Sequence, residues 1–186
     1  MAKRSGQTKR VSAEPKMAYV ALGANLGDAA VTMRRAAAEI VGWSLGQALG
    51  SSLWRTEPVD CPPGSPPFLN AALGLQPKAG TTPESLLDDV LSLEARLGRT
   101  RPGLANAPRV IDLDLIAFGT ETRVTPTLTL PHPCAHERAF VLAPLAELAP
   151  GLLLPGQRQT VTALLAALCQ VEGVSKLEPL MNANEC

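Results

Sequence analysis

The chain has few aromatic residues and almost no histidine. Its 186 residues include three Phe, two Trp, one Tyr and two His. So few flat side chains argue against an RNA-binding sheet, in which neighbouring strand aromatics stack on successive bases. The four Cys form no Cys-x-x-Cys pair, which argues against a structural zinc site. No apolar run reaches the roughly 18 residues that cross a bilayer, so we expect a reduced, cytoplasmic protein without a membrane partner.

The charges balance over the whole chain but not along it. Seventeen basic and seventeen acidic residues cancel, yet residues 1–16 hold five basic side chains and one acidic one, leaving this segment about four units positive. The remaining body is therefore acidic, which argues against a nucleic-acid partner held by bulk electrostatics. We expect residues 1–16 to be a disordered basic leader and residues 17–186 to form a single domain.

Hydrophobic periodicity predicts alternating strands and helices. We expect strands over 18–23, 49–55, 68–75 and about 110–118, and helices that begin after Asp28 and Thr82. This order is that of an α+β, ferredoxin-like split βαβ sandwich with an antiparallel sheet. A C-terminal extension should add a hairpin at 119–130 and helical runs near 138–148 and 160–168, with Pro144 breaking the first.

Two acids, Asp112 and Asp114, lie in a run that is otherwise typical of a buried strand. Side chains alternate along a strand, so both acids share a face with Val110 and Ile116, while Ile111, Leu113, Leu115 and Ala117 share the other. Two like charges on an apolar strand are costly unless a cation or hydrogen-bond donors compensate them, and a metal is the simplest compensation. Cα atoms two residues apart on a strand are separated by about 6.6 Å, and paired catalytic metal ions by about 3.5 to 4 Å. The two aspartate side chains therefore need to lean together only slightly to hold two ions. Oxygen ligands favour Mg²⁺ over zinc. The alternative is a solvated edge strand whose acids pair with nearby arginines.

The residues around this acid pair suit a phosphate ligand. Arg99, Arg101 and Arg109 precede it, and Glu94 lies near the end of the preceding helix. With two divalent ions, these arginines supply enough positive charge for a nucleoside triphosphate. The Gly23 and Gly27 turn is not a P-loop, because it lacks the Lys and the Ser or Thr that such a loop requires.

Histidine and phenylalanine provide weaker signals. His132 and His136, with Cys134 between them, do not make a zinc set, because no second ligand pair occurs elsewhere. A single His that contacts phosphate and a surface His without a role both remain open. Phe68 and Phe140 each lie beside polar residues, so they are candidates to sandwich a flat heterocycle; core packing is the alternative.

Five ordered blocks carry a family resemblance. They read AYVALGANLG from Ala18, SSLWRTEP from Ser51, FLNAA from Phe68, PRVIDLDLIAFG from Pro108, and LPHP from Leu130 followed by Arg138-Ala139-Phe140. From about residue 17 to 150 the chain resembles 6-hydroxymethyl-7,8-dihydropterin pyrophosphokinase (HPPK), an enzyme family of folate biosynthesis. The resemblance implies transfer of pyrophosphate from ATP, as co-substrate, to the hydroxymethyl group of the pterin, giving AMP, with two Mg²⁺ ions.

The resemblance also implies roles for particular residues. Catalytic roles fall on Arg99, Arg109, Asp112 and Asp114, of which the aspartates hold both metal ions. Pterin-binding roles fall on Thr56, Val59, Phe68, Asn70 and Phe140, and ATP-binding roles on Glu94, Arg101, Leu115, His132 and Arg138. The implied partners are ATP and the reduced pterin alone, bound by a monomer.

The chain departs from the family pattern at three places. Asn106 and Ala107 stand where a Trp and a Gly are frequent, Pro133 stands where Tyr is frequent, and the pterin loop reads Glu57-Pro58-Val59-Asp60. We therefore expect looser loop closure with the backbone contacts retained. The alternative function is a non-catalytic ferredoxin-like module that binds RNA, with the basic leader as its anchor.

Overall fold

The first six predicted elements occur in the predicted order. A computed structural model describes residues 16–58, 61–100, 107–168 and 173–181. The elements are β1 (Ala18–Ala24), α1 (Ala29–Val41), β2 (Leu49–Gly50), β3 (Ser52–Thr56), β4 (Phe68–Leu75), α2 (Pro83–Arg96) and β5 (Asp112–Phe118). They are followed by β6 (Arg123–Val124), β7 (Thr129–Leu130), the 3-10 turn η1 (Ala135–Glu137), α3 (Ala139–Leu148), α4 (Val161–Ala167) and β8 (Val174–Pro179).

Capping residues fix where the first two helices begin. The Asp28 side chain accepts a hydrogen bond from the Val31 amide at 3.1 Å, as the sequence predicts for an N-cap. Thr82 and Ser85 form a reciprocal capping box, and Pro83 occupies the first turn, where its missing N–H costs nothing. Both helices therefore start from local chemistry alone.

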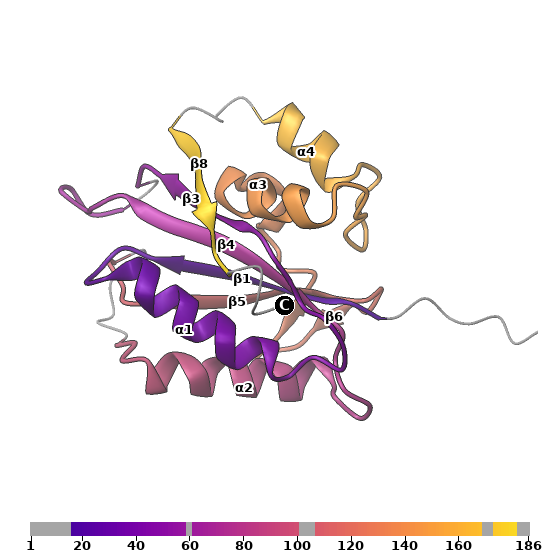
Figure 1. The fold of residues 1–186 in the computed structure, drawn as a ribbon. Coiled ribbons are helices and arrows are strands. Elements are labelled where there is room, and N and C mark those ends of the chain that lie inside the picture. The colour runs from indigo at the N-terminus through magenta and orange to yellow at the C-terminus, as the bar shows by residue number, and fades with distance from the viewer. Residues whose placement is uncertain (1–15, 59–60, 101–106, 169–172, 182–186) are drawn as a thin grey trace, which may run out of the picture.

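The sheet is antiparallel, and its main path runs β5-β1-β4-β3-β8, with β2 paired to β4. Helices α1 and α2 cover one face, and α3 and α4 cover the other (Figure 1). Two apolar cores result, one on each face, so the domain is a mixed α+β fold of three layers. Strand β1 lies between β4 and β5 and sets the register of both.

The face assignment on β5 is confirmed for the acids and wrong for Ala117. Leu113 and Leu115 pack in the α1/α2 core, and Ile116 packs on the opposite face. Between Leu115 and Ala117 the register with β1 shifts, so Ile116 is an extra residue on β5. Such a bulge turns the following residue over, and Ala117 joins Ile116 in the α3/α4 core.

Two further predictions are corrected. Pro144 does not break α3; it lies inside the helix and is buried, so apolar packing outweighs the single backbone bond that proline removes. The strand expected over 49–55 divides at Ser51, whose hydroxyl accepts a hydrogen bond from the Ala72 amide at 2.9 Å in place of a ladder carbonyl.

The C-terminal strand β8 was not predicted, since its exposed side chains give no alternating pattern. It pairs with the outer edge of β3 and ends in two core residues, Leu180 and Met181 (Figure 1). Gly50 makes room for this anchor, because a Cβ at Gly50 would lie 2.5 Å from Met181 Cε.

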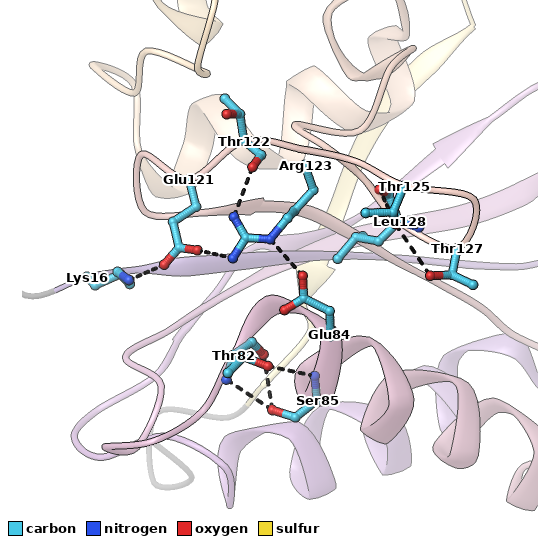
Figure 2. A network of polar contacts seen from close by, with 10 residues as sticks. All are labelled: Lys16, Thr82, Glu84, Ser85, Glu121, Thr122, Arg123, Thr125, Thr127 and Leu128. Atoms are coloured by element: carbon cyan, nitrogen blue, oxygen red, sulfur yellow. Dashed lines mark hydrogen bonds and ion pairs between the residues drawn. The ribbon is translucent and has the colours of Figure 1, made fainter.

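A network of exposed ion pairs links the start of β1, the β6/β7 hairpin and the start of α2 (Figure 2). Arg123 contacts Glu84 at 2.6 Å and Glu121 at 2.5 Å, and Lys16 pairs with the other oxygen of Glu121. These four residues, Lys16, Glu84, Glu121 and Arg123, are called the surface network below. Each charge in it has an opposite partner within the network.

Candidate active site

A cavity of about 810 Å³ lies on the sheet face that also carries α3. Its walls come from β1, β3, β4, β5, the start of α3 and the start of β8. Eight of the predicted site residues line it: Thr56, Phe68, Asn70, Arg109, Asp112, Asp114, Arg138 and Phe140. Residues far apart in the sequence thus meet in one pocket.

Gly23 forms the floor between the two ends of the cavity. In the sheet register it pairs with Asn70 on β4 and with Asp112 on β5. A Cβ at Gly23 would lie 3.3 Å from Asn70 Oδ1 and 3.9 Å from Asp112 Cβ, so a larger residue would crowd the amide. Glycine inside a strand often marks such a close approach. From the sequence, Gly23 was expected at the end of the first strand and in the turn that follows it, without a role in the site.

Asp112 is held by two guanidinium groups. Arg99 Nη1 pairs with Oδ1 of Asp112, and Arg109 Nη1 pairs with Oδ2. Arg99 also donates to the Ile111 carbonyl at 2.7 Å, so its guanidinium is tied to the start of β5. The edge-strand alternative is therefore correct in part, since β5 is an edge of the sheet path and Asp112 pairs with arginines. The face is not solvated, because the Asp112 side chain is only 22% exposed.

Glu94, on α2, supports the cluster of Arg99, Arg109 and Asp112. Its side chain is buried and accepts a hydrogen bond from the Leu113 amide at 2.7 Å. The same oxygen, Oε1, lies 3.4 Å from Arg99 Nη1. A buried carboxylate is stable only when charged and hydrogen-bonding partners surround it. Glu94 therefore joins α2 to β5 and orients Arg99.

Asp114 lacks the arginine partners of Asp112. Among the residues that the structure describes, none donates a hydrogen bond to its carboxylate. Burial and the nearby charge of Asp112 raise the pKa of Asp114, while His132, Arg138 and Arg109 lower it by less. The ionised form is therefore destabilised in the ligand-free protein, and a cation at this position would relieve that cost.

Two buried polar atoms beside the acids have no hydrogen-bond partner within the described ranges: Arg109 Nε and His132 Nδ1. Burial lowers the pKa of His132, and the charge of Arg138 adds to this effect, although Asp114 opposes it. The His132 amide donates to the Ile116 carbonyl at 2.9 Å, which fixes this loop against β5. Unsatisfied buried polar atoms are uncommon, so at a cavity they indicate groups that await a ligand.

The opposite end of the cavity is aromatic and amide-lined. Asn70 Nδ2 donates to Thr56 Oγ1 at 2.8 Å, and both side chains are buried. The Arg109 guanidinium lies 5.4 Å from the centroid of the Phe68 ring, and the Arg138 guanidinium lies 5.6 Å from that of Phe140. Each phenylalanine therefore couples the aromatic end to a basic residue of the acidic end.

Asn25 is a functional candidate that the sequence reading missed. Its Oδ1 accepts the Arg109 amide at 2.8 Å, and its Nδ2 donates to the Pro66 carbonyl at 3.1 Å. The Asn25 amide in turn donates to the Arg109 carbonyl at 3.0 Å. Asn25 thereby ties the segment before β5 to the loop before β4. In the sequence, Asn25 lies between Gly23 and Gly27, and this pattern by itself predicts only a turn.

Not every predicted residue lines the cavity. The Leu115 side chain lies in the α1/α2 core, so only its backbone faces β1. Val59 and Arg101 fall outside the described residues, as does Asn106. Among the described residues, no group of three or more His, Cys, Asp or Glu side chains is placed to hold a metal ion. Nor is any helix in the described ranges long and apolar enough to span a membrane.

Paired strand carboxylates, arginines and two phenylalanines line one pocket, a combination typical of an enzyme that transfers phosphoryl groups to a flat heterocyclic acceptor. The sequence model of the family described as 7,8-dihydro-6-hydroxymethylpterin-pyrophosphokinase (HPPK) matches residues 19–150. The chain belongs to this family.

Curated relatives agree with this membership. A 2-amino-4-hydroxy-6-hydroxymethyldihydropteridine pyrophosphokinase of Methylorubrum extorquens is 38% identical over 162 residues, which cover 87% of this chain and 98% of the relative. The enzyme of the same name from Bacillus subtilis is 39% identical over 133 residues, covering 71% of this chain and 77% of the relative.

A solved structure of wild-type Plasmodium falciparum HPPK-DHPS shares the fold. The TM-score is 0.61 at 14% identity, and the alignment covers 81% of this chain and 44% of that longer chain. At this identity, the likeness concerns the fold alone.

Proposed function

We propose that this protein transfers the pyrophosphoryl group of ATP to the hydroxymethyl group of 6-hydroxymethyl-7,8-dihydropterin, in the synthesis of folate. One observation carries the proposal: a single cavity joins an aromatic, amide-lined end to an end with two carboxylates, Asp112 and Asp114, and two arginines, Arg109 and Arg138. Family membership and the names of the relatives support the same reaction.

The pterin would occupy the aromatic end. Phe68 and Phe140 would stack on the two faces of its ring, while Asn70 and Thr56 would hydrogen-bond the ring edge. The buried Asn70–Thr56 pair supports this role, since a fixed amide presents one donor and one acceptor to a ring that carries both. Val59 would contribute from the loop after β3.

The triphosphate would occupy the other end. Arg109 and Arg99 would exchange Asp112 for phosphate oxygens, because a triphosphate offers more negative charge than one carboxylate. Arg138 and His132 would contact the nucleotide beside Asp114, with Arg101 approaching from its loop. Glu94 would act through Arg99, and Leu115 through its backbone.

Asp112 and Asp114 would hold two Mg²⁺ ions. Their carboxylate oxygens share one face of β5, and the unpaired position of Asp114 suits a hard cation. Magnesium, when bound, neutralises charge that develops on the phosphate oxygens. Two protein ligands leave the rest of each coordination shell to phosphate and water.

The chain's own residues would then position the reaction. The acceptor oxygen forms a bond to the β-phosphorus as the bond from that phosphorus to the oxygen of AMP breaks, and the hydroxyl proton is released. Such a transfer needs in-line placement and charge neutralisation rather than a covalent nucleophile. Asn25 would support the placement, because it holds the Arg109 backbone against the loop before β4.

The proposal also covers the fold, the oligomeric state, the location and the domain bounds. The strand order β5-β1-β4-β3 supports a ferredoxin-like arrangement. We further propose that the protein acts as a monomer. Use of ATP supports a cytoplasmic site of action. We also propose that residues 1–16 are a leader and that residues 17–186 form the enzymatic domain.

The test is a product assay with purified protein, ATP, Mg²⁺ and the reduced pterin. We expect stoichiometric AMP and pterin diphosphate. Release of ADP would overturn the reaction type, and binding of single-stranded RNA without AMP formation would favour the RNA-binding alternative.

A further inference from the structure

The cavity has a wall that comes from beyond the matched family region. The family match ends at residue 150, yet Leu168, Gly173 and Val174 also line the cavity. Leu168 is the C-cap of α4, Val174 is the first residue of β8, and Gly173 directly precedes it. The described C-terminal segment therefore contributes an apolar surface to a pocket that is otherwise built by the matched strands.

Sheet register places this wall beside the aromatic, amide-lined end. Val174 pairs directly with Thr56 across the β3–β8 ladder, so the two side chains point to the same face. Thr56 in turn accepts the hydrogen bond from Asn70. The partner of Thr56 on β4 is Phe68, so Val174 extends the row Phe68, Thr56 outward by one strand, and its position is half-buried at the cavity.

Several contacts hold this wall in place. Lys176, two residues after Val174, contacts Glu147 of α3 at 3.0 Å, and Glu147 also accepts hydrogen bonds from Ser52 and Trp54 of β3. The Leu180 amide donates to the Ser51 carbonyl at 3.0 Å. The strand is therefore fixed to the sheet and to a helix, and it is not free to swing away.

The turn into β8 is equally tight. Gly173 has φ +80°, and a Cβ there would lie 3.2 Å from Cγ of Glu57. Any other residue would be strained in this conformation and would push Glu57 outward. Glu57 follows Thr56 directly, so the start of β8 and the loop after β3 are packed against each other.

We infer that Val174, supported by Leu168, is a specificity-determining residue that sets how large a pterin the aromatic, amide-lined end accepts. The inference rests on the proposed function. A fixed apolar residue next to the Asn70–Thr56 hydrogen bond excludes added alkyl groups by steric overlap. One methylene in such a pocket changes selectivity by about tenfold or more.

The experiment compares Val174→Trp and Val174→Ala with Leu177→Trp as the matched control. Leu177 lies on the same strand, three residues away and beyond the last regular β3–β8 pair before the register shift; it is not among the residues that line the cavity, and it is 39% exposed. Calorimetry measures binding of the reduced hydroxymethylpterin in the presence of a non-hydrolysable ATP analogue, and binding of the analogue alone. A series of pterins alkylated at different ring positions tests size selection.

We expect Val174→Trp to raise the pterin Kd by about tenfold or more and to leave the Kd of the analogue within about twofold. Leu177→Trp should change neither constant. Val174→Ala should reduce the discrimination against at least one alkylated pterin by about tenfold.

Wild-type affinity in Val174→Trp, or unchanged discrimination in Val174→Ala, would overturn the inference. If melting curves show that Val174→Trp does not fold, the alanine variant decides alone. A wild-type protein that neither binds pterin nor releases AMP would instead refute the proposed function, so the two failures are distinguishable.

Discussion

The surface network and the acidic end of the cavity contain the same kinds of ion pair in very different settings. In the surface network, side-chain exposure runs from 26% for Glu121 to 49% for Lys16 and Glu84. In the cluster around Asp112, which borders the cavity, the Arg99, Arg109 and Asp112 side chains are 14%, 18% and 22% exposed, and Glu94 is 3% exposed. Water therefore screens the first group far more than the second.

The two clusters also differ in completeness. Every charge of the surface network meets an opposite charge within it (Figure 2). The cavity cluster leaves Arg109 Nε and His132 Nδ1 without partners among the described residues, and it leaves Asp114 with a raised pKa. A complete network leaves no charged group free for a ligand, whereas an incomplete, buried one leaves groups that a ligand can satisfy.

The largest expected effect follows from replacing Asp114 by Asn. Activity should fall by about 10³-fold or more, because the proposed metal ligand is lost. In chelator, the same variant should be more stable than the wild type at pH 7, by about 1 kcal/mol. Since the folded-state pKa of Asp114 is raised above 3.8, its ionisation costs stability at every pH above that raised value.

The stability difference should shrink as pH falls and disappear below pH 3.8, where both states of the wild type are protonated. Chemical unfolding at several pH values, beside the AMP assay, measures both quantities. A variant that is active, or less stable than the wild type at pH 7, would contradict the assignment of Asp114.

Arg109→Ala should have the next largest effect. It removes a guanidinium that pairs with Asp112 and lies over Phe68, so we expect kcat to fall by about 10²-fold or more. The pterin Kd should rise by less, because a single cation–π contact is worth about 1 kcal/mol. Single-turnover kinetics with titrations separate the two, and a change in Kd alone would refute a role in transfer.

Local sequence signals predicted much of the fold, because each acts within a few residues. The N-caps at Asp28 and Thr82 and the alternation that puts Asp112 and Asp114 on one face are of this kind. The bulge at Ile116 and the strand β8 depend on partners far along the chain, so no local pattern specifies them.

The candidate site, too, combines features that local sequence predicts with features that depend on distant partners. The residue types at Phe68, Asn70, Asp112 and Asp114 could be selected from the sequence, and the fold brings them to one cavity. The supporting contacts of Asn25 and Glu94 could not, because each joins segments that are close only after folding. Positioning residues are therefore harder to predict than the groups that they orient.

Glu94→Gln should have an intermediate effect, seen mainly in stability. The neutral amide keeps its size but leaves Arg99 beside a buried dipole instead of a charge. We expect a loss of about 2–3 kcal/mol in the free energy of unfolding, with kcat reduced by about tenfold through misplacement of Arg99. Urea unfolding and steady-state kinetics measure these, and an unchanged unfolding midpoint would refute the supporting role.

Arg123→Ala should have the smallest effect, and it completes the comparison. Arg123 lowers the pKa of Glu84, Lys16 and then Arg123 lower the pKa of Glu121, and the two carboxylates raise the pKa of Arg123. The Glu84 side chain is exposed and those of Arg123 and Glu121 are partly exposed, so we expect kcat to be unchanged and the melting temperature to shift only slightly. The shift should vanish in 1 M salt, where screening removes exposed pairs. A large shift in melting temperature that persists in high salt would show that the surface network stabilises the fold strongly, and the contrast with the cavity would then fail.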